Sequence, residues 1–198
     1  MNAKFFDLKQ EKQDRIINAA LKIFAKNGYN HASTDDMVKE AQISKGLLFH
    51  YFDSKIGVYS FLYDYAVRLI AIELGSAIDP SETSYFEILR QMEAAKMLVL
   101  RSHPYMYMFL NSTKRENITE AILATEESKK TLENNLGTIL ARTNQDFLKE
   151  NKSAKDYLKM MDCTLEAIME DALLDGSFNA DMNYKESIKY INLTEKMI

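Results

Sequence analysis

Residues 33–55 read STDDMVKEAQISKGLLFHYFDSK. The stretch predicts two short helices joined by a tight turn, the first ending near Ala41 and the second running from Lys45 to about Phe52. The opening Ser-Thr pair can cap the first helix, because a hydroxyl accepts hydrogen bonds from the free N–H groups of a helix start. Two helices joined by so short a turn form a helix-turn-helix, whose second helix enters the major groove in DNA-binding proteins.

The second predicted helix has an inward and an outward side. Leu48 and Phe52, one turn apart, are the expected core anchors. That spacing leaves the other faces to Lys45, Gly46, Leu47, Phe49, His50 and Tyr51. Soluble proteins rarely expose several aromatic residues beside a lysine without a binding role, so we interpret this face as a nucleic-acid surface. The alternative is an ordinary solvated face, and for His50 the two interpretations are equally good.

The flanking segments support this element. Residues 10–27 are expected to form a helix whose apolar stripe consists of Ile16, Ile17, Ala20, Leu21 and Phe24. Gly28 ends that helix, and Tyr29 is expected to fold back onto the core. A long helix over residues 55–75 follows and would link the helix-turn-helix to the rest of the chain.

Taken in order, these residues resemble the tetracycline-repressor (TetR) family of transcription regulators. The resemblance covers about residues 12–60 and rests on Ile-Ile-x-Ala-Ala-Leu-x-x-Phe at 16–24, Gly28-Tyr29, Ala41-x-Ile43-Ser44-Lys45-Gly46 and Phe49-His50-Tyr51-Phe52-x-Ser54-Lys55. It implies that DNA is contacted by Thr34, Ser44, Lys45, Gly46, Leu47, Phe49, His50, Tyr51 and Lys55, with Thr34, Tyr51 and Lys55 on phosphates. It also implies an all-helical homodimer with a C-terminal ligand-sensing domain.

Two positions depart from the family pattern. Position 42 is usually Gly, because the turn tends toward a left-handed backbone, and Gln42 there should cost about 1 kcal/mol. Position 49 is commonly Tyr, and Phe49 can touch a thymine methyl but cannot bond a phosphate.

The whole chain predicts an all-α protein with two domains. Among its 198 residues are only 2 Pro and 6 Gly, and long stretches are rich in helix-forming residues. We expect a DNA-binding domain over residues 1–54 and a helical ligand-sensing and dimerisation domain over 55–198. Within the second domain a helix ends at 102–104, a tract at 105–110 is apolar all round, and a break is possible near Asn134-Asn135 and Gly137.

Charge and composition set broad limits. The net charge is −4, yet residues 1–55 hold nine Lys/Arg and seven Asp/Glu, so this segment is mildly basic. The chain contains no apolar run long enough for a membrane span, and its charged start does not fit a signal peptide. A single cysteine fits a reducing compartment. We therefore expect a cytoplasmic protein with no membrane partner.

The second predicted domain is rich in methionine and aromatic residues, which can line an adaptable apolar pocket. The predicted lining consists of Met92, Tyr105, Met108, Phe109, Met161 and Leu165. An unknown small effector, largely apolar or aromatic, is the expected ligand. For any one of these residues, ordinary helix-bundle core is the simpler interpretation.

The end of the chain is expected to form the dimer interface. Residues 154–174 carry two apolar stripes, which indicates one face for the core and one for a partner. The predicted interface consists of Leu158, Met169, Leu173, Tyr184, Ile188 and Ile191.

Other classes of function have less support. The three histidines have no evident partner in the sequence, Cys163 lies in an apolar stripe where an inert buried thiol is expected, and no phosphate-binding glycine loop is present. We therefore predict no catalysis, no metal and no cofactor. The expected function is a DNA-binding repressor released by its effector. The alternatives are a helical adaptor whose 33–55 surface binds a protein and, with least support, a small-molecule enzyme.

Overall fold

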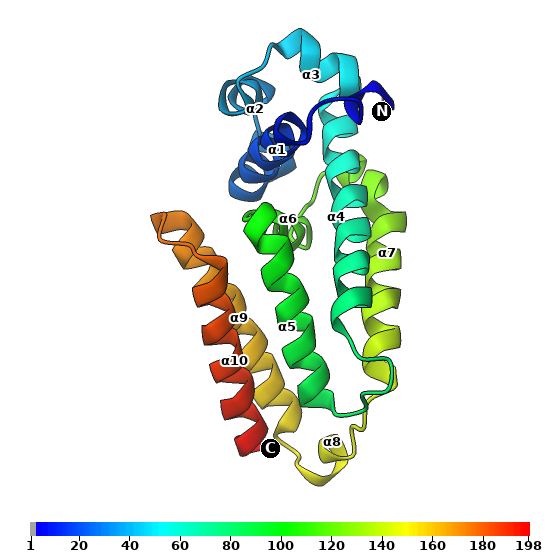
Figure 1. Cartoon of the computed structure of the whole chain (residues 1–198), viewed down its shortest axis with the longest axis vertical. Helices are drawn as coiled ribbons and strands as arrows, with labels where there is room; N and C mark the ends of the chain where they lie inside the picture. The colour runs from blue at the N-terminus through cyan, green and yellow to red at the C-terminus, as the bar shows by residue number, and fades with distance from the viewer. Residues whose placement is uncertain (1–2) are drawn as a thin grey trace. The chain divides into compact units, whose positions relative to one another are not determined.

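A computed structural model describes residues 3–198 (Figure 1). In chain order the helices are η1 (Ala3–Phe5), α1 (Gln10–His31), α2 (Thr34–Ala41), α3 (Lys45–Phe52), α4 (Lys55–Ala77), α5 (Tyr85–Ser102), α6 (Met106–Thr113), α7 (Thr119–Ala141), α8 (Phe147–Glu150), α9 (Ala154–Asp175) and α10 (Ala180–Met197). The described residues contain no β-strand, and one isolated bridge joins Ser84 and Asn144. The all-α prediction is therefore confirmed.

The ends of two helices can be compared with the sequence prediction. α1 is bounded by His31, but Gly28 within it has a non-helical backbone with φ 65° and ψ 177°. The regular helix is therefore interrupted at Gly28, as predicted, and one further turn follows the kink. α7 runs unbroken through Asn134 and Gly137, so the break considered there is absent. A glycine inside a helix costs about 1 kcal/mol, which is too little to interrupt a helix of this length.

The chain forms two compact units. The first unit comprises residues up to Leu69 together with Ser102–Leu132, and the second comprises Ile70–Arg101 together with Glu133–Ile198. α4 and α7 therefore contribute to both units. The predicted division of roles between residues 1–54 and 55–198 stays a prediction, since the packing also joins α6 and the first part of α7 to the N-terminal helices.

Aromatic side chains fill the core of the first unit. The ring of Tyr59 on α4 lies 4.9 Å from that of Phe24 on α1 and 5.3 Å from that of Phe109 on α6, measured between centroids. All three residues are at most 1% exposed. Burial of the apolar tract at 105–110 is confirmed by Met106 and Phe109, which are fully buried.

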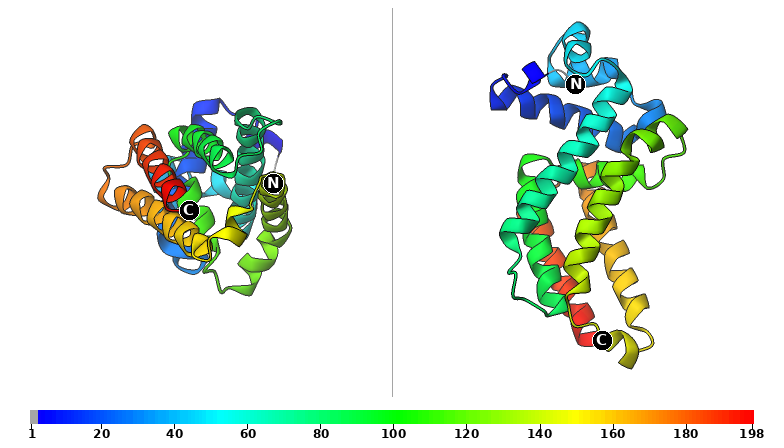
Figure 2. Two further views of the ribbon diagram at one scale, coloured as in Figure 1. Left: turned by 90° about the horizontal axis from the view of Figure 1, so that it is seen from below. Right: turned by 90° about the vertical axis from the view of Figure 1, so that its right-hand side faces the viewer.

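The second unit is built mainly on α5, α9 and α10. α9 and α10 run side by side (Figures 1 and 2). The buried cluster of this unit consists of Phe86, Met161, Leu165 and Ile191. Arg90 of α5 adds polar links, because its guanidinium donates to Asn192 Oδ1 at 3.0 Å and pairs with Glu195 at 2.8 Å on α10.

Candidate nucleic-acid interface

α2 and α3 begin and end as the sequence predicts. The Ser33 hydroxyl accepts hydrogen bonds from the N–H groups of Asp35 and Asp36 at 3.2 and 3.4 Å. The Ser44 hydroxyl accepts one from the N–H of Leu47 at 3.2 Å and so caps α3. Between the helices, Gln42 has φ 54° and ψ 49°, so the turn is left-handed without a glycine.

α3 presents one side to the core and the other to solvent. Leu48 and Phe52 are each 1% exposed, as predicted for core anchors. Ser44, Lys45, Gly46 and His50 are exposed, and Leu47 and Phe49 are half-buried.

Tyr51 was predicted on the outer face, and this prediction is wrong. Its side chain is 6% exposed, and its ring centroid lies 5.6 Å from that of Phe5. Tyr51 is three positions after Leu48, so a core-facing stripe wider than a single row includes both. The phosphate contact expected of Tyr51 stays a prediction, and it depends on the small part of the residue that is exposed.

A short segment before α1 also holds α3 in place. Phe5 is fully buried, and its ring contacts Phe52 of α3 and Phe61 of α4 at centroid distances of 5.0 and 5.4 Å. Gln13 of α1 fixes the same segment, because its side-chain amide donates to the carbonyls of Phe6 and Leu8 at 3.2 and 2.8 Å. This role was not predicted, although the Phe5-Phe6 pair amid polar residues is a signal in the sequence.

The connection between α3 and α4 is unusually close. Asp53 has a positive φ of 64°, and the Ser54 hydroxyl caps α4 by accepting from the N–H of Gly57 at 3.1 Å. A Cβ atom at Gly57 would lie 1.9 Å from the carbonyl oxygen of Phe52. Only glycine therefore allows α4 to start so near the end of α3.

α1 holds the outer end of α2 through two basic side chains. Arg15 donates to the carbonyl of Ala41 at 2.8 Å, which occupies an acceptor at the C-terminal end of α2. Lys22 pairs with Glu40 at 2.6 Å, and that hydrogen bond raises the pKa of Lys22 above its ordinary value.

The predicted basic contacts have partners within the chain. Lys45 forms an exposed ion pair with Asp35 at 2.8 Å. Such exposed pairs contribute at most about 1 kcal/mol, so a phosphate or a base edge can replace Asp35 at little cost. Thr34 is half-buried as the first residue of α2.

Lys55 has a structural role that the sequence did not reveal. Its ammonium group donates to the carbonyls of Asn30 and Ala32 at 3.2 and 3.0 Å, and it lies 4.6 Å from the ring centroid of Tyr29. It therefore joins the start of α4 to the end of α1. Its phosphate contact stays a prediction.

The end of α1 is fixed to the start of α7. The N–H of Tyr29 donates to Glu116 at 3.0 Å, and its hydroxyl donates to Glu120 at 3.1 Å. Burial, together with the acceptor Glu120, raises the pKa of Tyr29 to about 12. Tyr29 is 7% exposed, which confirms that it folds back onto the core.

His103, which had no evident partner in the sequence, lies in a buried polar network. Its ring nitrogens are 2.9 Å from the Tyr65 hydroxyl and 2.8 Å from Asn18 Oδ1. Asn18 in turn donates to the carbonyl of Ser102 at 2.9 Å. His103 is 2% exposed, and burial lowers its pKa below the ordinary value. The network joins α1 and α4 to the segment between α5 and α6.

The residues predicted to line one ligand pocket divide between the two units. Tyr105, Met108 and Phe109 belong to the first, and Met92, Met161 and Leu165 belong to the second. Phe109 is fully buried against other rings, and Met161 and Leu165 are part of the packed cluster of the second unit. For these three residues, helix-bundle core was the better interpretation. Neither unit by itself brings all six to one cavity.

The predicted dimer interface needs correction. Met169, Leu173 and Ile191 are 1%, 3% and 1% exposed, so they face the interior of the chain. Leu158, Tyr184 and Ile188 are half-buried. The error arose because α9 has a single buried stripe where two apolar stripes were expected. Its buried residues follow each other at four-residue spacing from Met161 to Leu173. Cys163 is exposed, so the expected burial of its thiol is also wrong.

Two kinds of site are absent from the described residues: a membrane-spanning helix and a cluster of metal ligands. Over residues 3–198, no helix combines the length and the apolar character needed to cross a bilayer. Within the same range, no three His, Cys, Asp or Glu side chains are arranged to hold a metal ion.

Comparison with known proteins finds a family match over the helix-turn-helix. Residues 16–59 match the sequence model described as bacterial regulatory proteins, tetR family. The HTH-type transcriptional regulator YuxN of Bacillus subtilis (strain 168) is 36% identical over 80 residues, which are 38% of this chain and 27% of YuxN. IcaR, the HTH-type negative transcriptional regulator of the biofilm operon icaADBC in Staphylococcus aureus (strain Newman), is 28% identical over 111 residues, 52% of this chain and 56% of IcaR. The matched region thus spans from about a quarter to just over half of these relatives.

Solved structures share the fold over most of the chain. The fatty acid degradation regulator FadR from Bacillus halodurans has a TM-score of 0.58 and 19% identity, covering 90% of this chain and 96% of that one. FadR from Bacillus subtilis in complex with stearoyl-CoA has a TM-score of 0.60 and 16% identity, covering 91% and 96%. At these identities the likeness establishes the fold alone.

Proposed function

We propose that this chain, whose residues 16–59 match the model of the tetR family of bacterial regulatory proteins, is a DNA-binding transcription regulator of that family. We propose further that it is a repressor that a small, largely apolar or aromatic molecule releases from its operator. One observation carries the proposal: Lys45, Gly46 and His50 are exposed on the outer face of α3. The opposite face is anchored by three buried side chains, those of Leu48, Tyr51 and Phe52. A helix held in this way can enter a major groove.

Gly46 supports close approach to DNA. A Cβ atom there would meet no atom within 4 Å, so the fold does not require a glycine at this position. An absent side chain near the start of α3 lets the backbone come closer to base edges or phosphates, as glycines do at other ligand contacts.

Repression is the proposed direction of control. The relative IcaR is a negative regulator, and it aligns with about half of this chain. The effector would favour a shape that does not fit the operator, and it can shift the population only by its difference in affinity for the two shapes. α4 follows α3 directly and extends into the second unit, so it is the proposed route of transmission.

A homodimer is the proposed assembly. Two copies of α3 about 34 Å apart would reach successive major-groove faces of a near-palindromic site. Exposed apolar side chains on α9 and α10 replace the predicted interface: Met160, Leu174, Met182, Leu193 and Met197, which are 47–62% exposed.

The test is fluorescence anisotropy with a labelled duplex taken from upstream of the gene, over a salt series, for wild type and Lys45→Ala. We expect binding that weakens steeply with salt, and a loss of about 10-fold or more in affinity for the best site in the variant. Lys152→Ala, an exposed lysine of the second unit, is the matched control and should bind as wild type does.

Wild-type protein that binds every duplex equally and weakly would contradict the proposal. That result would favour the adaptor hypothesis, in which the face of α3 binds a protein. Release by an effector is tested on the same complex by adding apolar ligands, with stearoyl-CoA as one probe because a neighbour of the same fold is known with it.

A further inference from the structure

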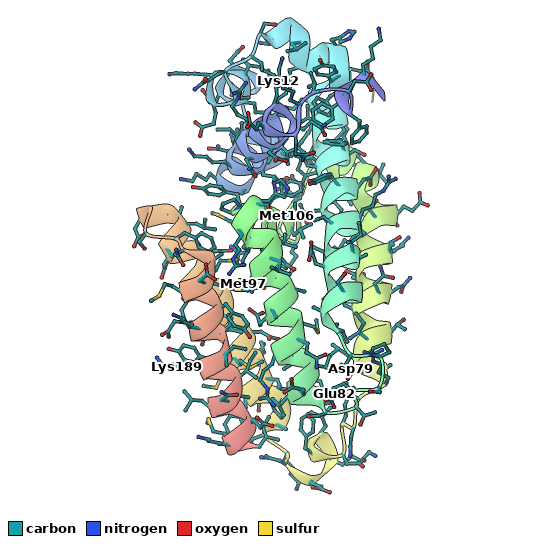
Figure 3. The ribbon with its side chains drawn as sticks, in the orientation of Figure 1. Lys12, Asp79, Glu82, Met97, Met106 and Lys189 are labelled. Atoms are coloured by element: carbon teal, nitrogen blue, oxygen red, sulfur yellow. The ribbon has the colours of Figure 1, made fainter. Side chains whose placement is uncertain are left out.

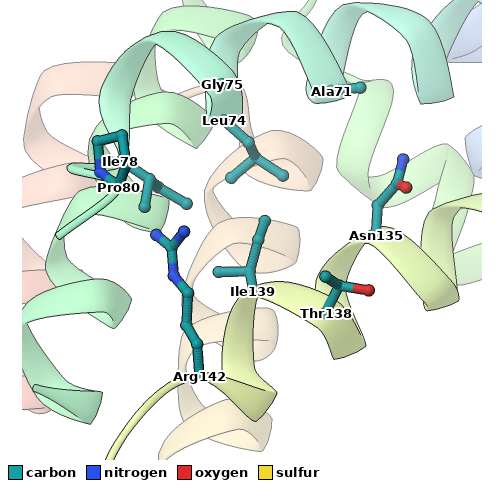
Figure 4. A pocket seen from close by; sticks show the side chains of 9 residues that line it. All are labelled: Ala71, Leu74, Gly75, Ile78, Pro80, Asn135, Thr138, Ile139 and Arg142. Atoms are coloured by element: carbon teal, nitrogen blue, oxygen red, sulfur yellow. The ribbon is translucent and has the colours of Figure 1, made fainter. Parts of the chain in front are cut away.

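A cavity of about 450 Å³ that is open to solvent lies on the second unit, between the last turns of α4 and of α7. Its volume is in the range of small-ligand sites, about 300–1,000 Å³. The lining consists of Ala71, Leu74, Gly75, Ile78, Pro80, Asn135, Thr138, Ile139 and Arg142. Leu74 and Ile139 point toward each other across it (Figure 4).

Small side chains on α4 keep the cavity open. Ala71 and Gly75 are one turn apart on the wall, whereas Leu74 and Ile78 are 4% and 8% exposed and form an apolar floor. A ligand with an apolar body can therefore bury its surface on aliphatic carbon without displacing a side chain.

The end of the cavity is held by one hydrogen bond from the loop after α4 to α5 and by one between the loops after α4 and α7. The N–H of Asp79 donates to Gln91 Oε1 at 2.9 Å, and the N–H of Asn144 donates to the carbonyl of Thr83 at 2.8 Å. Asp79 and Glu82 lie together in the loop after α4 (Figure 3). The loop after α7 is therefore fixed to the loop after α4, and the cavity does not depend on a mobile rim.

Arg142 places a positive charge at this fixed end. Its guanidinium donates to the carbonyl of Asp79 at 3.1 Å and lies beside Ile78 and Pro80 in the close-up view (Figure 4). The Asp79 carboxylate accepts two hydrogen bonds at Oδ1, from the hydroxyl and the N–H of Ser81 at 2.7 and 2.8 Å. Arginine keeps further N–H groups in a planar fork, the geometry that binds a carboxylate through two parallel hydrogen bonds.

We propose that this cavity binds a small apolar carboxylic acid, with its hydrocarbon or aryl body on Leu74, Ile78 and Ile139 and its carboxylate on Arg142. The identification of this acid as the effector rests on the proposed function. Binding of the acid itself requires only the second unit's side chains. Asn135 and Thr138 lie on the α7 side, where a second polar group of the ligand can be bonded.

A purely structural role for Arg142 is the competing explanation. The residue follows the C-terminus of α7, where a cation stabilises the helix and where the field of the helix end disfavours an anion. The two roles differ in one respect: only a ligand site distinguishes an acid from its neutral amide.

The first experiment blocks the cavity without straining the fold. Gly75→Leu places a side chain into the cavity, and Gly137→Leu is the matched control, because a Cβ at either glycine meets no atom within 4 Å and Gly137 does not line the cavity. Binding of 3-phenylpropanoate is measured by calorimetry on the full chain without DNA. We expect saturable binding to wild type and Gly137→Leu, and a loss of at least about 10-fold in Gly75→Leu.

The second experiment tests the charge. Arg142→Gln should weaken 3-phenylpropanoate about 10-fold and leave 3-phenylpropanamide unchanged, since only the acid uses the guanidinium. No saturable binding to wild type, equal binding of acid and amide, or equal binding by Gly75→Leu and Gly137→Leu would each overturn the assignment.

DNA binding is measured separately on the same proteins. Specific DNA binding without binding of the acid would leave the proposed function in place and remove this site. If the acid binds as expected but no specific DNA binding is found, the cavity remains a binding site for the acid and the proposed repressor function is rejected.

Discussion

The first unit holds α3 by aromatic rings and by side chains that bond to backbone carbonyls of other segments, whereas the second unit holds α9 by a single stripe of Met and Leu. Phe5 and Lys55 each reach across from another element to fix the surroundings of α3. On α9, Met161, Leu165 and Met169 follow one another at one-turn spacing against apolar neighbours.

The difference concerns how much each unit tolerates change. Ring contacts and hydrogen bonds depend on distance and angle, so they hold one geometry. Methionine and leucine can substitute for each other at a cost usually below about 1.5 kcal/mol. The first unit thus suits the fixed recognition surface that we propose for it, and the second has packing that can adjust to the proposed effector.

The largest effect is expected at Phe5. Phe5→Ala should lower the free energy of unfolding by about 3–5 kcal/mol, because a fully buried ring between α3 and α4 is lost. Its neighbour Phe6 is 52% exposed, so Phe6→Ala should cost less than about 1 kcal/mol. Urea unfolding measures both. Met161→Leu in the second unit should cost less than about 1.5 kcal/mol, and a cost equal to that of Phe5→Ala would end the contrast between the units.

Two glycines extend the comparison to the backbone. Gly57→Ala should destabilise the chain by about 2–3 kcal/mol, since its Cβ would overlap the carbonyl oxygen of Phe52. Gly137→Ala in the second unit meets no atom and should stabilise α7 by up to about 1 kcal/mol. Thermal unfolding with calorimetry compares them. Equal midpoints for the two variants would show that the joint between α3 and α4 relaxes freely.

The polar network of the first unit predicts a pH dependence. Burial holds the pKa of His103 below its ordinary value of 6.5, so the folded chain keeps the ring neutral while the unfolded chain takes up a proton. Stability contributed by this group is therefore present at neutral pH and is lost as pH falls below about 6.5. Asp14 acts in the opposite direction and limits the shift.

His103→Gln isolates this contribution. We expect a loss of about 1–3 kcal/mol at pH 8 from the broken network, and a smaller fall in stability between pH 7 and pH 5 than in wild type. His31→Gln, at an exposed histidine, is the control and should keep the wild-type pH profile. An unchanged profile in His103→Gln would assign the acid sensitivity to other groups.

Local signals predicted the helix-turn-helix almost residue by residue. Caps depend on neighbours in sequence, so the Ser44 cap was predicted correctly from the residues themselves. The left-handed backbone found at Gln42 was expected from the family pattern at this position and not from a local signal. The partners of Tyr51 and Lys55 are not local. The ring of Phe5 and the carbonyl of Asn30 come from other elements, and no periodicity within α3 or α4 indicates them.

The errors on α9 have a similar cause. Its apolar residues admit two stripes, and the packing of α9 against other elements, α10 among them, decides that Met169 and Leu173 join Met161 and Leu165 inside. The predicted pocket residues Phe109, Met161 and Leu165 lie in packed core, because methionine, leucine and aromatic residues serve equally well as core and as ligand lining. Composition cannot distinguish these two uses. The cavity lined by Gly75 and Arg142 has no methionine or aromatic residue in its lining, so the residue types that suggested a pocket did not indicate it.

The smallest effect is expected at Gln42, and it tests how rigid the recognition turn is. Gln42→Gly should raise stability by about 0.5–1 kcal/mol, because the left-handed backbone at φ 54° is strained for a residue with a side chain. The capping bonds of this residue use its backbone N–H and survive the change. Lys39→Gly inside α2 is the control and should cost about 1 kcal/mol. If the turn is as fixed as the rest of the first unit, the gain appears in urea unfolding with DNA affinity unchanged. A gain in stability together with a loss of specific affinity would mean that glutamine holds α3 at an angle that glycine does not keep.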